Sequence, residues 1–311
     1  MMFIGSENSV ATRLTARALA FVLFASVLSV VPFVSTASAQ TDFVPWECNG
    51  TPILMRGGVF HEILPDPANP GELIIQAVPG TSGIANSTAH DPLTNWVYGV
   101  RNSNGQRVVR AYDATGAIVF DTPIQAPFPE DTGGFAGTVL GDGRYIIHSV
   151  GGADATAQVG WFNGNRRNLW SIDPLTGAAT HLGVDPGVAD ISYNPADGFV
   201  YHVINRVLYQ IDPNNGTITT TPTSADLANG SFGASWFDSS GNLFLFDNNP
   251  GDIWRVNVND PNDVELVGQP GSDGGTDGTN CISSIDLTKD CLLYTSPSPR
   301  DATLSRMPSS A

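Results

Sequence analysis

Short apolar runs that follow clusters of turn residues recur along the middle of the chain. Four stretches place Asp, Asn, Pro or Gly directly before β-branched and aromatic residues: HDPLTNWVYGV (90–100), LGDGRYIIHSV (140–150), YNPADGFVYHVI (193–204) and FDSSGNLFLFD (237–247). Turn residues that lead into an apolar run are typical of a hairpin that feeds an inner strand. Each stretch therefore predicts a β-hairpin.

A second pattern follows some of these hairpins. An alternating strand ends at Asp, turn residues lead to Gly, and another strand begins in VVRAYDATGAIVF (108–120), NLWSIDPLTGAATHL (168–182) and VLYQIDPNNGTITTT (207–221); DIWRVNVNDPNDVELVG (252–268) is a looser copy. Pro174 and Pro213 preset the turn, and the glycines permit positive φ. The pattern predicts a second hairpin in each repeat.

The repeat spacing indicates the fold. Asp173 and Asp212 are 39 residues apart, and Tyr201 and Phe244 are 43 apart. Periods of about 40–45 residues with four strands each are typical of propeller blades. We expect an all-β protein, a β-propeller of roughly five to seven blades with its ends joined at the closing blade. A β-sandwich is the alternative, but it does not explain the paired motif. The aromatic residues of the repeats are expected to pack between blades: Trp96, Tyr98, Phe199, Tyr201 and Phe244.

The N-terminus resembles an export signal. Arg13 and Arg17 precede an apolar run from Ala18 to Val34, and Ala37-Ser38-Ala39 forms a small-x-small cleavage site. These features predict a secretory signal peptide over residues 1–39, with an uncleaved membrane anchor as the alternative. We therefore expect a secreted or cell-surface protein whose propeller domain spans residues 40–290.

Charge narrows the range of partners. The chain of 311 residues has 14 Lys and Arg against 30 Asp and Glu, a formal net charge of −16. Nucleic-acid binding requires clustered basic residues, and docking on anionic lipid requires them too, so neither partner is expected. The acidic residues suit a secreted protein that must remain soluble, with cation binding as the alternative interpretation.

Cysteine positions predict a bridge at the closure. Cys48 and Cys281 lie near the two ends of the predicted propeller, and closing the ring brings those ends together. In an oxidising compartment a disulfide between them would fasten the seam. Two free thiols are the alternative. Cys291 is left over as a third cysteine.

Several segments together resemble a known family. The WECNG start, FGASWFDSSGNLFLFDNNPGDIWRV (232–256) and GSDGGTDGTNC (271–281) are similar to an uncharacterised family of exported proteins, a domain of unknown function. The resemblance covers about Pro45 to Ser284. It implies a β-propeller that often forms the first module of longer bacterial surface proteins. It supplies no catalytic or cofactor-binding residues.

The last 21 residues, Cys291 to Ala311, follow none of these patterns. CLLYTSPSPRD (291–301) resembles the translation of a sequencing adapter, and SRMPSSA (305–311) resembles that of the downstream primer. We therefore expect an adapter-derived, disordered tail on a truncated fragment whose genuine sequence ends near Asp290.

One segment offers metal ligands. Asp273, Asp277 and Asn280 stand among glycines in GSDGGTDGTN (271–280), and oxygen ligands of this kind suit Ca²⁺. The spacing is not that of an EF-hand, so a tight polar loop before the seam is the favoured interpretation and the calcium site the alternative. The five His residues show no metal-ligand spacing, and no other cofactor is expected.

These observations favour a binding or scaffold module over an enzyme. Loops on a rigid propeller rim suit recognition of an extracellular protein or a glycan. The alternative is a metal-dependent propeller hydrolase or lyase at the central channel, where Asp190, Asn205 and Asp247 would lie by analogy of fold alone. A spacer without a ligand is a third hypothesis.

Overall fold

The computed structural model describes residues 43–48, 50–69, 73–128, 134–149, 167–186, 189–271 and 275–281. The expected signal peptide and tail lie outside these residues. Alternating side chains make the segments strands: in β17 (Asn242–Phe246), Leu243 and Leu245 are buried on either side of the more exposed Phe244. In β14 (Val207–Ile211), Leu208 and Ile211 are buried on opposite faces. Tight turns with positive-φ residues, such as Asn104-Gly105 and Asn205-Arg206, reverse the chain between strands.

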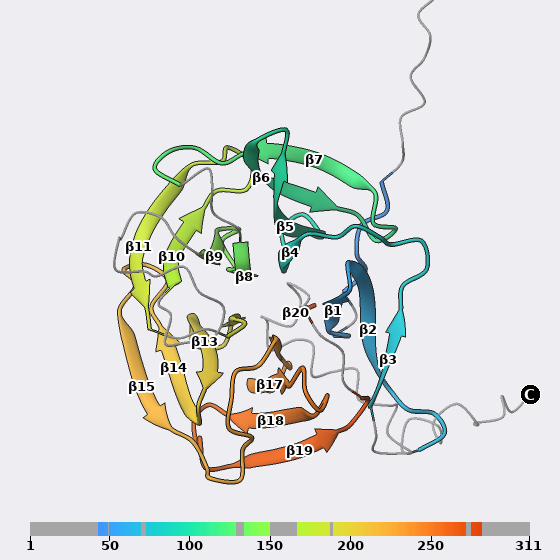
Figure 1. The fold of residues 1–311 in the computed structure, drawn as a ribbon, viewed down its shortest axis with the longest axis vertical. Coiled ribbons are helices and arrows are strands. Elements are labelled where there is room, and N and C mark those ends of the chain that lie inside the picture. Colours follow the sequence, from blue (N-terminus) through green and yellow to red (C-terminus); the bar gives the residue numbers. More distant parts are fainter. Residues whose placement is uncertain are drawn as a thin grey trace, which may run out of the picture. The chain divides into compact units, whose positions relative to one another are not determined.

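Five four-stranded antiparallel sheets form the described fold, each of them one blade (Figure 1). The first strand of each sequence repeat is innermost. Blade 2 contains β4 (Asn86–Asp91), β5 (Trp96–Ser103), β6 (Gln106–Tyr112) and β7 (Ile118–Pro123). Blade 3 contains β8 (Gly134–Val139), β9 (Tyr145–Ser149), β10 (Arg167–Ile172) and β11 (Ala179–Asp185). Blade 4 contains β12 (Ser192–Asn194), β13 (Phe199–Ile204), β14 and β15 (Ile218–Pro222). Blade 5 contains β16 (Ala234–Phe237), β17 (Asn242–Phe246), β18 (Ile253–Asn257) and β19 (Val264–Gly268).

Blade 1 closes the ring with strands from both ends of the propeller. Its sheet order is β20-β1-β2-β3, with β1 (Ile53–Arg56), β2 (Val59–Pro65), β3 (Leu73–Ala77) and β20 (Thr276–Thr279). Strand β20 is innermost and pairs antiparallel with β1, with Leu54 opposite Gly278. The predicted propeller with joined ends is confirmed, with five blades.

Apolar side chains fill each gap between neighbouring blades. One cluster joins blades 2 and 3 through Tyr98 and Trp170, and another joins blades 4 and 5 through Tyr201 and Leu243. Three more clusters join the remaining pairs of neighbours. The five repeat aromatics expected to pack between blades all belong to these clusters or pack against them. Because every sheet is covered on both faces by other sheets, no helix layer is required.

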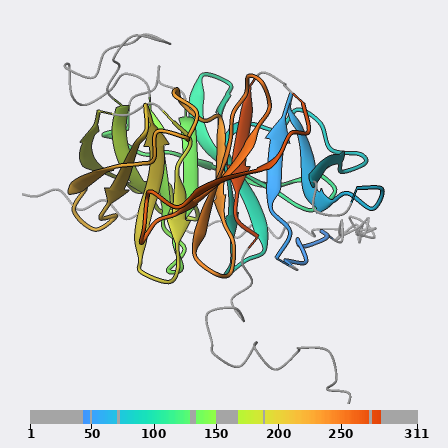
Figure 2. The ribbon, with the colours of Figure 1, turned by 90° about the horizontal axis from the view of Figure 1, so that it is seen from below.

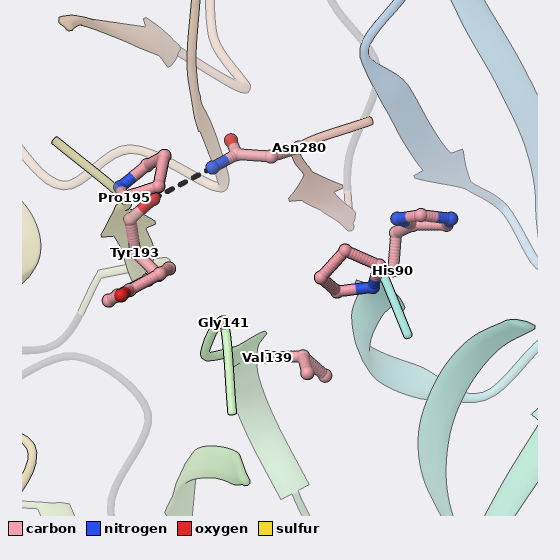
Figure 3. A pocket seen from close by; sticks show the side chains of 7 residues that line it. His90, Val139, Gly141, Tyr193, Pro195 and Asn280 are labelled. Carbon is pink, nitrogen blue, oxygen red and sulfur yellow. Dashed lines mark hydrogen bonds between the residues drawn. The ribbon is translucent and has the colours of Figure 1, made fainter. Parts of the chain in front are cut away.

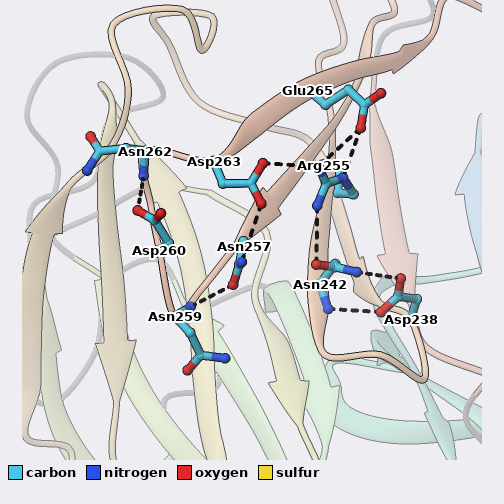
Figure 4. A network of polar contacts seen from close by, with 9 residues as sticks. All are labelled: Asp238, Asn242, Arg255, Asn257, Asn259, Asp260, Asn262, Asp263 and Glu265. Atoms are coloured by element: carbon cyan, nitrogen blue, oxygen red, sulfur yellow. Dashed lines mark hydrogen bonds and ion pairs between the residues drawn. The ribbon is translucent and has the colours of Figure 1, made fainter.

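Acidic side chains hold the turns of the blades. The repeated Asp at the end of the third strand accepts backbone N–H bonds two to four residues ahead: Asp113 from Thr115 and Ala117, and Asp173 from Leu175. On blade 5, Arg255 bonds both Asp263 and Glu265 at 3.1 Å (Figure 4). Much of the negative charge therefore serves turns and surface pairs.

The repeated Gly after the Asp of each second hairpin does more than permit the turn, because it also lets the preceding blade approach closely. Gly177 has φ 74°, and a Cβ built on it would lie 1.9 Å from the carbonyl oxygen of Pro123 in the preceding blade. Gly216 has φ 72° and meets Leu182 of its preceding blade in the same way. Glycine is therefore required both by the backbone conformation and by the close approach of two blades.

The inner strands pack tightly around the axis, and Figure 2 shows the blades side by side from the edge of the ring. A Cβ on Gly137 of β8 would lie 2.6 Å from the carbonyl oxygen of Ser87 in β4. A Cβ on Gly278 of β20 would lie 2.7 Å from that of Ser235 in β16. Residues 276–279 were expected in a polar loop; they form the buried strand β20 instead, because Gly278 lets that strand approach its neighbour.

No helix with the length and hydrophobicity needed to cross a membrane occurs in the described part of the chain.

Candidate functional site

A pocket lies where the inner strands of four blades end. It has a cavity volume of about 30 Å³, opens to solvent, and is lined by His90, Pro92, Val139, Gly141, Tyr193, Pro195 and Asn280 (Figure 3). Each lining residue stands at or just after the carboxyl end of β4, β8, β12 or β20. The pocket therefore marks one mouth of the central channel, where loops are held by a rigid scaffold.

Cross-blade hydrogen bonds fix the wall of this pocket. The side-chain amide of Asn280 donates to the carbonyl oxygen of Tyr193 at 2.8 Å, and its oxygen accepts from the backbone N–H of Phe237. The backbone N–H of Tyr193 donates to the hydroxyl of Thr138 at 3.0 Å. Gly141 leaves room beside the Tyr193 ring, since a Cβ there would lie 3.6 Å from the phenol oxygen. The apolar walls are thus positioned by bonds to blades 1, 3, 4 and 5.

The predicted disulfide lies behind His90. Cys48 and Cys281 are bonded, with their Cα atoms 5.0 Å apart across 233 residues of sequence. Nε2 of His90 lies 3.2 Å from Sγ of Cys48, and its Nδ1 lies 3.5 Å from the same sulfur. Burial lowers the pKa of His90 to about 4, so the ring is neutral at physiological pH. Sequence reasoning predicted the bridge but missed the histidine, because only the fold brings them together.

Two buried carboxyls meet at the axis. Oδ2 of Asp190, just before β12, accepts backbone N–H bonds from Ser235 at 2.7 Å and Gly278 at 3.0 Å. Oδ2 of Asp277, in β20, accepts the backbone N–H of Thr88. Burial raises the pKa of Asp190, and burial together with the neighbouring Asp190 charge raises that of Asp277. These two residues join blades 1, 2, 4 and 5 in one polar centre.

A second buried cluster links blades 3 and 4. Oδ2 of Asp185 lies 3.0 Å from Nε2 of His148 and 2.8 Å from Nε2 of His202. All three side chains are fully buried. Burial alone would raise the pKa of Asp185, but the two histidines hold it well below its ordinary range. The His148 and His202 rings contact edge to face, with 5.8 Å between centroids.

The sequence-predicted calcium ligands have separate surroundings. Asp273 lies outside the described residues, so the predicted set is not tested. Asp277 accepts the backbone N–H of Thr88 and interacts with Asp190, whereas Asn280 forms hydrogen bonds with the backbone of Tyr193 and Phe237. Calcium in this segment therefore stays a prediction.

Of the residues placed at the channel by analogy, one lies there. Asp190 is 3% exposed and belongs to the axial centre. Asn205 lies in the turn between β13 and β14, where its N–H donates to the carbonyl oxygen of Gly230 at 2.7 Å. Asp247 holds the turn after β17 by accepting the N–H of Asn249 at 2.9 Å. Both turns join second and third strands, and the innermost strand of blades 4 and 5 is the first strand of each.

Several solved structures resemble the fold. A chain of a nidogen/laminin complex matches with 8% identity and a TM-score of 0.44, covering 75% of this chain and 98% of that one. TolB from Acinetobacter baumannii matches with 15% identity and a TM-score of 0.40, covering 71% of this chain and 54% of that one. A functionally unknown protein from Desulfotomaculum acetoxidans has 12% identity and a TM-score of 0.42, with 78% and 90% covered.

The sequence comparison identifies the family. No curated protein matches the sequence. A family profile described as Repeat of unknown function (DUF6923) matches residues 66–283, from just after β2 of the closing blade to just past β20. Because this match extends over more than half of the chain, the protein belongs to the DUF6923 family of repeats of unknown function.

Proposed function

We propose that this propeller is a binding module of an exported protein, and that the channel-mouth pocket receives apolar side chains of a partner protein. The observation that carries the proposal is the pocket itself, an apolar recess held by bonds between blades. Export is supported by the disulfide, since such bonds persist in oxidising compartments.

The lining favours a protein partner over a glycan. Pro92, Val139, Pro195 and the Tyr193 ring supply apolar surface. The polar atoms of Asn280 already bond to the backbone, and His90 is only 4% exposed. Sugar recognition requires several free donors and acceptors, whereas an apolar side chain requires only a shaped recess. The net charge of −16 further favours a partner with basic residues around its apolar anchor.

The geometry gives less support to a hydrolase or lyase. A reaction at the channel would use the carboxyls nearest the axis, and Asp190 and Asp277 are 3% and 1% exposed. Both are enclosed by inner strands rather than lining the pocket. A substrate therefore has no described route to them, and binding at the mouth is the better-supported function.

A peptide selection tests the proposal. Phage displaying random peptides are selected on the immobilised full chain, and the enriched peptides are measured by calorimetry on variants. Gly141→Leu fills the recess beside Tyr193 without a positive-φ penalty, and Gly230→Leu is a control at a glycine with open surroundings. We expect peptides with apolar anchors that lose at least tenfold in affinity to Gly141→Leu and keep their affinity for Gly230→Leu. Peptides that bind Gly141→Leu as well as wild type would refute the pocket as the site.

A further inference from the structure

Three buried oxygen atoms at the propeller axis lack a hydrogen-bond partner among the described residues. They are Oδ1 of Asp190, Oδ1 of Asp277 and Oγ1 of Thr88, on residues that are 3%, 1% and 0% exposed. Buried polar atoms are rarely left unpaired, because an atom removed from water without a new hydrogen bond keeps its full desolvation penalty. A propeller with nothing bound to these three oxygens would therefore carry three such penalties at its axis.

The surrounding contacts hold the other polar atoms of these three residues. Ser235 and Gly278 hold the other oxygen of Asp190, and the N–H of Thr88 holds the other oxygen of Asp277. The Thr88 hydroxyl lies close enough to Asp277 to lower the pKa of its carboxyl. Thr88 lies in the irregular part of β4 between Asn86 and Ala89, where the regular pairing with β5 shifts. The bulge thus turns a hydroxyl toward the carboxyl pair.

The charge at this point is not balanced by a basic side chain in the described structure. The contacts of Asp190 and Asp277 are backbone N–H groups, hydroxyls and each other. Two adjacent carboxylates with no counter-charge repel each other strongly in a buried setting. The centre therefore requires either a shared proton or a bound cation.

Charge distinguishes these two solutions. A proton shared by the carboxyls would bridge their unpaired oxygens and leave the Thr88 hydroxyl to donate to Asp277, but one of the two buried negative charges would stay without a counter-charge. A cation accepts lone pairs from all three at once. Carboxylate and hydroxyl oxygens are hard ligands, and two carboxylates match a divalent charge.

We propose that a calcium ion binds on the propeller axis between Asp190 and Asp277, with the Thr88 hydroxyl as a third ligand. This site keeps Asp277 from the sequence prediction but replaces Asp273 and Asn280 with residues of blades 4 and 2. It does not depend on ligand binding at the channel mouth. Its role is to fasten the closing strand β20 to the ring.

Metal content and calcium titration test this site on the full chain. Protein purified without chelator is analysed by mass spectrometry for bound metals, then stripped with EDTA and titrated with CaCl₂ by calorimetry. We expect one calcium per chain. Calcium at 100 times its Kd should raise the melting temperature of the stripped protein by about 5–10 °C, in line with mass action.

Variants distinguish calcium binding at this site from nonspecific binding to acidic side chains. Asp190→Asn and Asp277→Asn should abolish the calcium-dependent shift, and the isosteric Thr88→Val should weaken calcium binding about tenfold. Asp121→Asn, which alters an exposed partner of Arg110, is the matched acidic control and should leave binding unchanged. A stripped wild-type chain that shows neither heat nor a thermal shift with millimolar calcium would overturn the proposal in favour of the shared proton. Calcium binding that survives in Thr88→Val and Asp190→Asn at wild-type affinity would place the ion elsewhere.

Discussion

Cys48 and Cys281 are joined across 233 residues of sequence, at the point where the closing strand β20 pairs with β1. Cys281 lies two residues after the end of β20, and both cysteines pack in the apolar cluster between blades 1 and 2 with Trp46 and Phe60. The covalent link and the β-sheet pairing therefore close the same seam.

Removing this link should lower stability strongly. For a loop of this length, the chain-entropy description assigns the disulfide about 5 kcal/mol of unfolding free energy. We expect Cys48→Ala/Cys281→Ala to shift the urea midpoint downward, and tris(2-carboxyethyl)phosphine to shift wild type to a similar value. Unchanged midpoints for both the variant and the reduced protein would contradict a seam held by the disulfide.

The close approach of Gly137 to Ser87 should leave no room for a side chain at position 137. A Cβ at Gly137 would lie 2.6 Å from the Ser87 carbonyl oxygen and 2.8 Å from the Tyr145 ring, both rigidly placed in the core. We expect Gly137→Ala to lose about 1–3 kcal/mol of unfolding free energy through overpacking. Gly230→Ala, where nothing lies within 4 Å, is the control and should stay within about 0.5 kcal/mol of wild type by chemical denaturation.

We expect stability to require an amide, and not a carboxylate, at position 280. Asn280→Asp keeps the shape but places an oxygen against the carbonyl oxygen of Tyr193, which now accepts the side-chain N–H at 2.8 Å. We expect a loss of about 2–3 kcal/mol at neutral pH, because the bond is replaced by repulsion in a half-buried site. Asn102→Asp, at an exposed turn where Asn102 accepts the Gly105 N–H, should change stability little in the same melting experiment. Equal effects of the two substitutions would argue against a stabilising hydrogen bond from Asn280 to Tyr193.

Local chemistry explains what was predictable. The Asp-to-Gly turns and the apolar runs lie within a few residues of each other, so blades 2 to 4 could be predicted directly from the sequence. The seam followed from the positions of two cysteines. Blade 1 was harder, because its sheet joins β1–β3 to a strand more than 200 residues away, and its first turn uses Gly57-Gly58 rather than the repeated motif. Blade number was therefore predicted only as a range.

The polar centres could not be predicted for the same reason. Asp190 and Asp277 are far apart in sequence and meet only because both inner strands face the axis. The Gly-rich surroundings of Asp277 are typical of a loop, and only close packing at Gly278 makes that segment a strand. His148 and His202 belong to different repeats, at equivalent places in YIIHS and FVYHV, and this repetition was the signal in the sequence.

The acid stability of the protein should depend on Asp185. Its folded pKa lies well below the value of about 3.9 expected in the unfolded chain, because His148 and His202 stabilise the carboxylate. A depressed folded pKa means that the ionised group stabilises the fold above about pH 4, and this contribution is lost as the pH falls toward the folded pKa. We expect Asp185→Asn to cost about 3 kcal/mol at pH 7, because the buried histidines lose their charged partner. Denaturant titrations at pH 7, 5, 4 and 3 should show the difference between wild type and variant narrowing below pH 4. A difference that stays constant over this range would show that Asp185 acts through packing rather than charge.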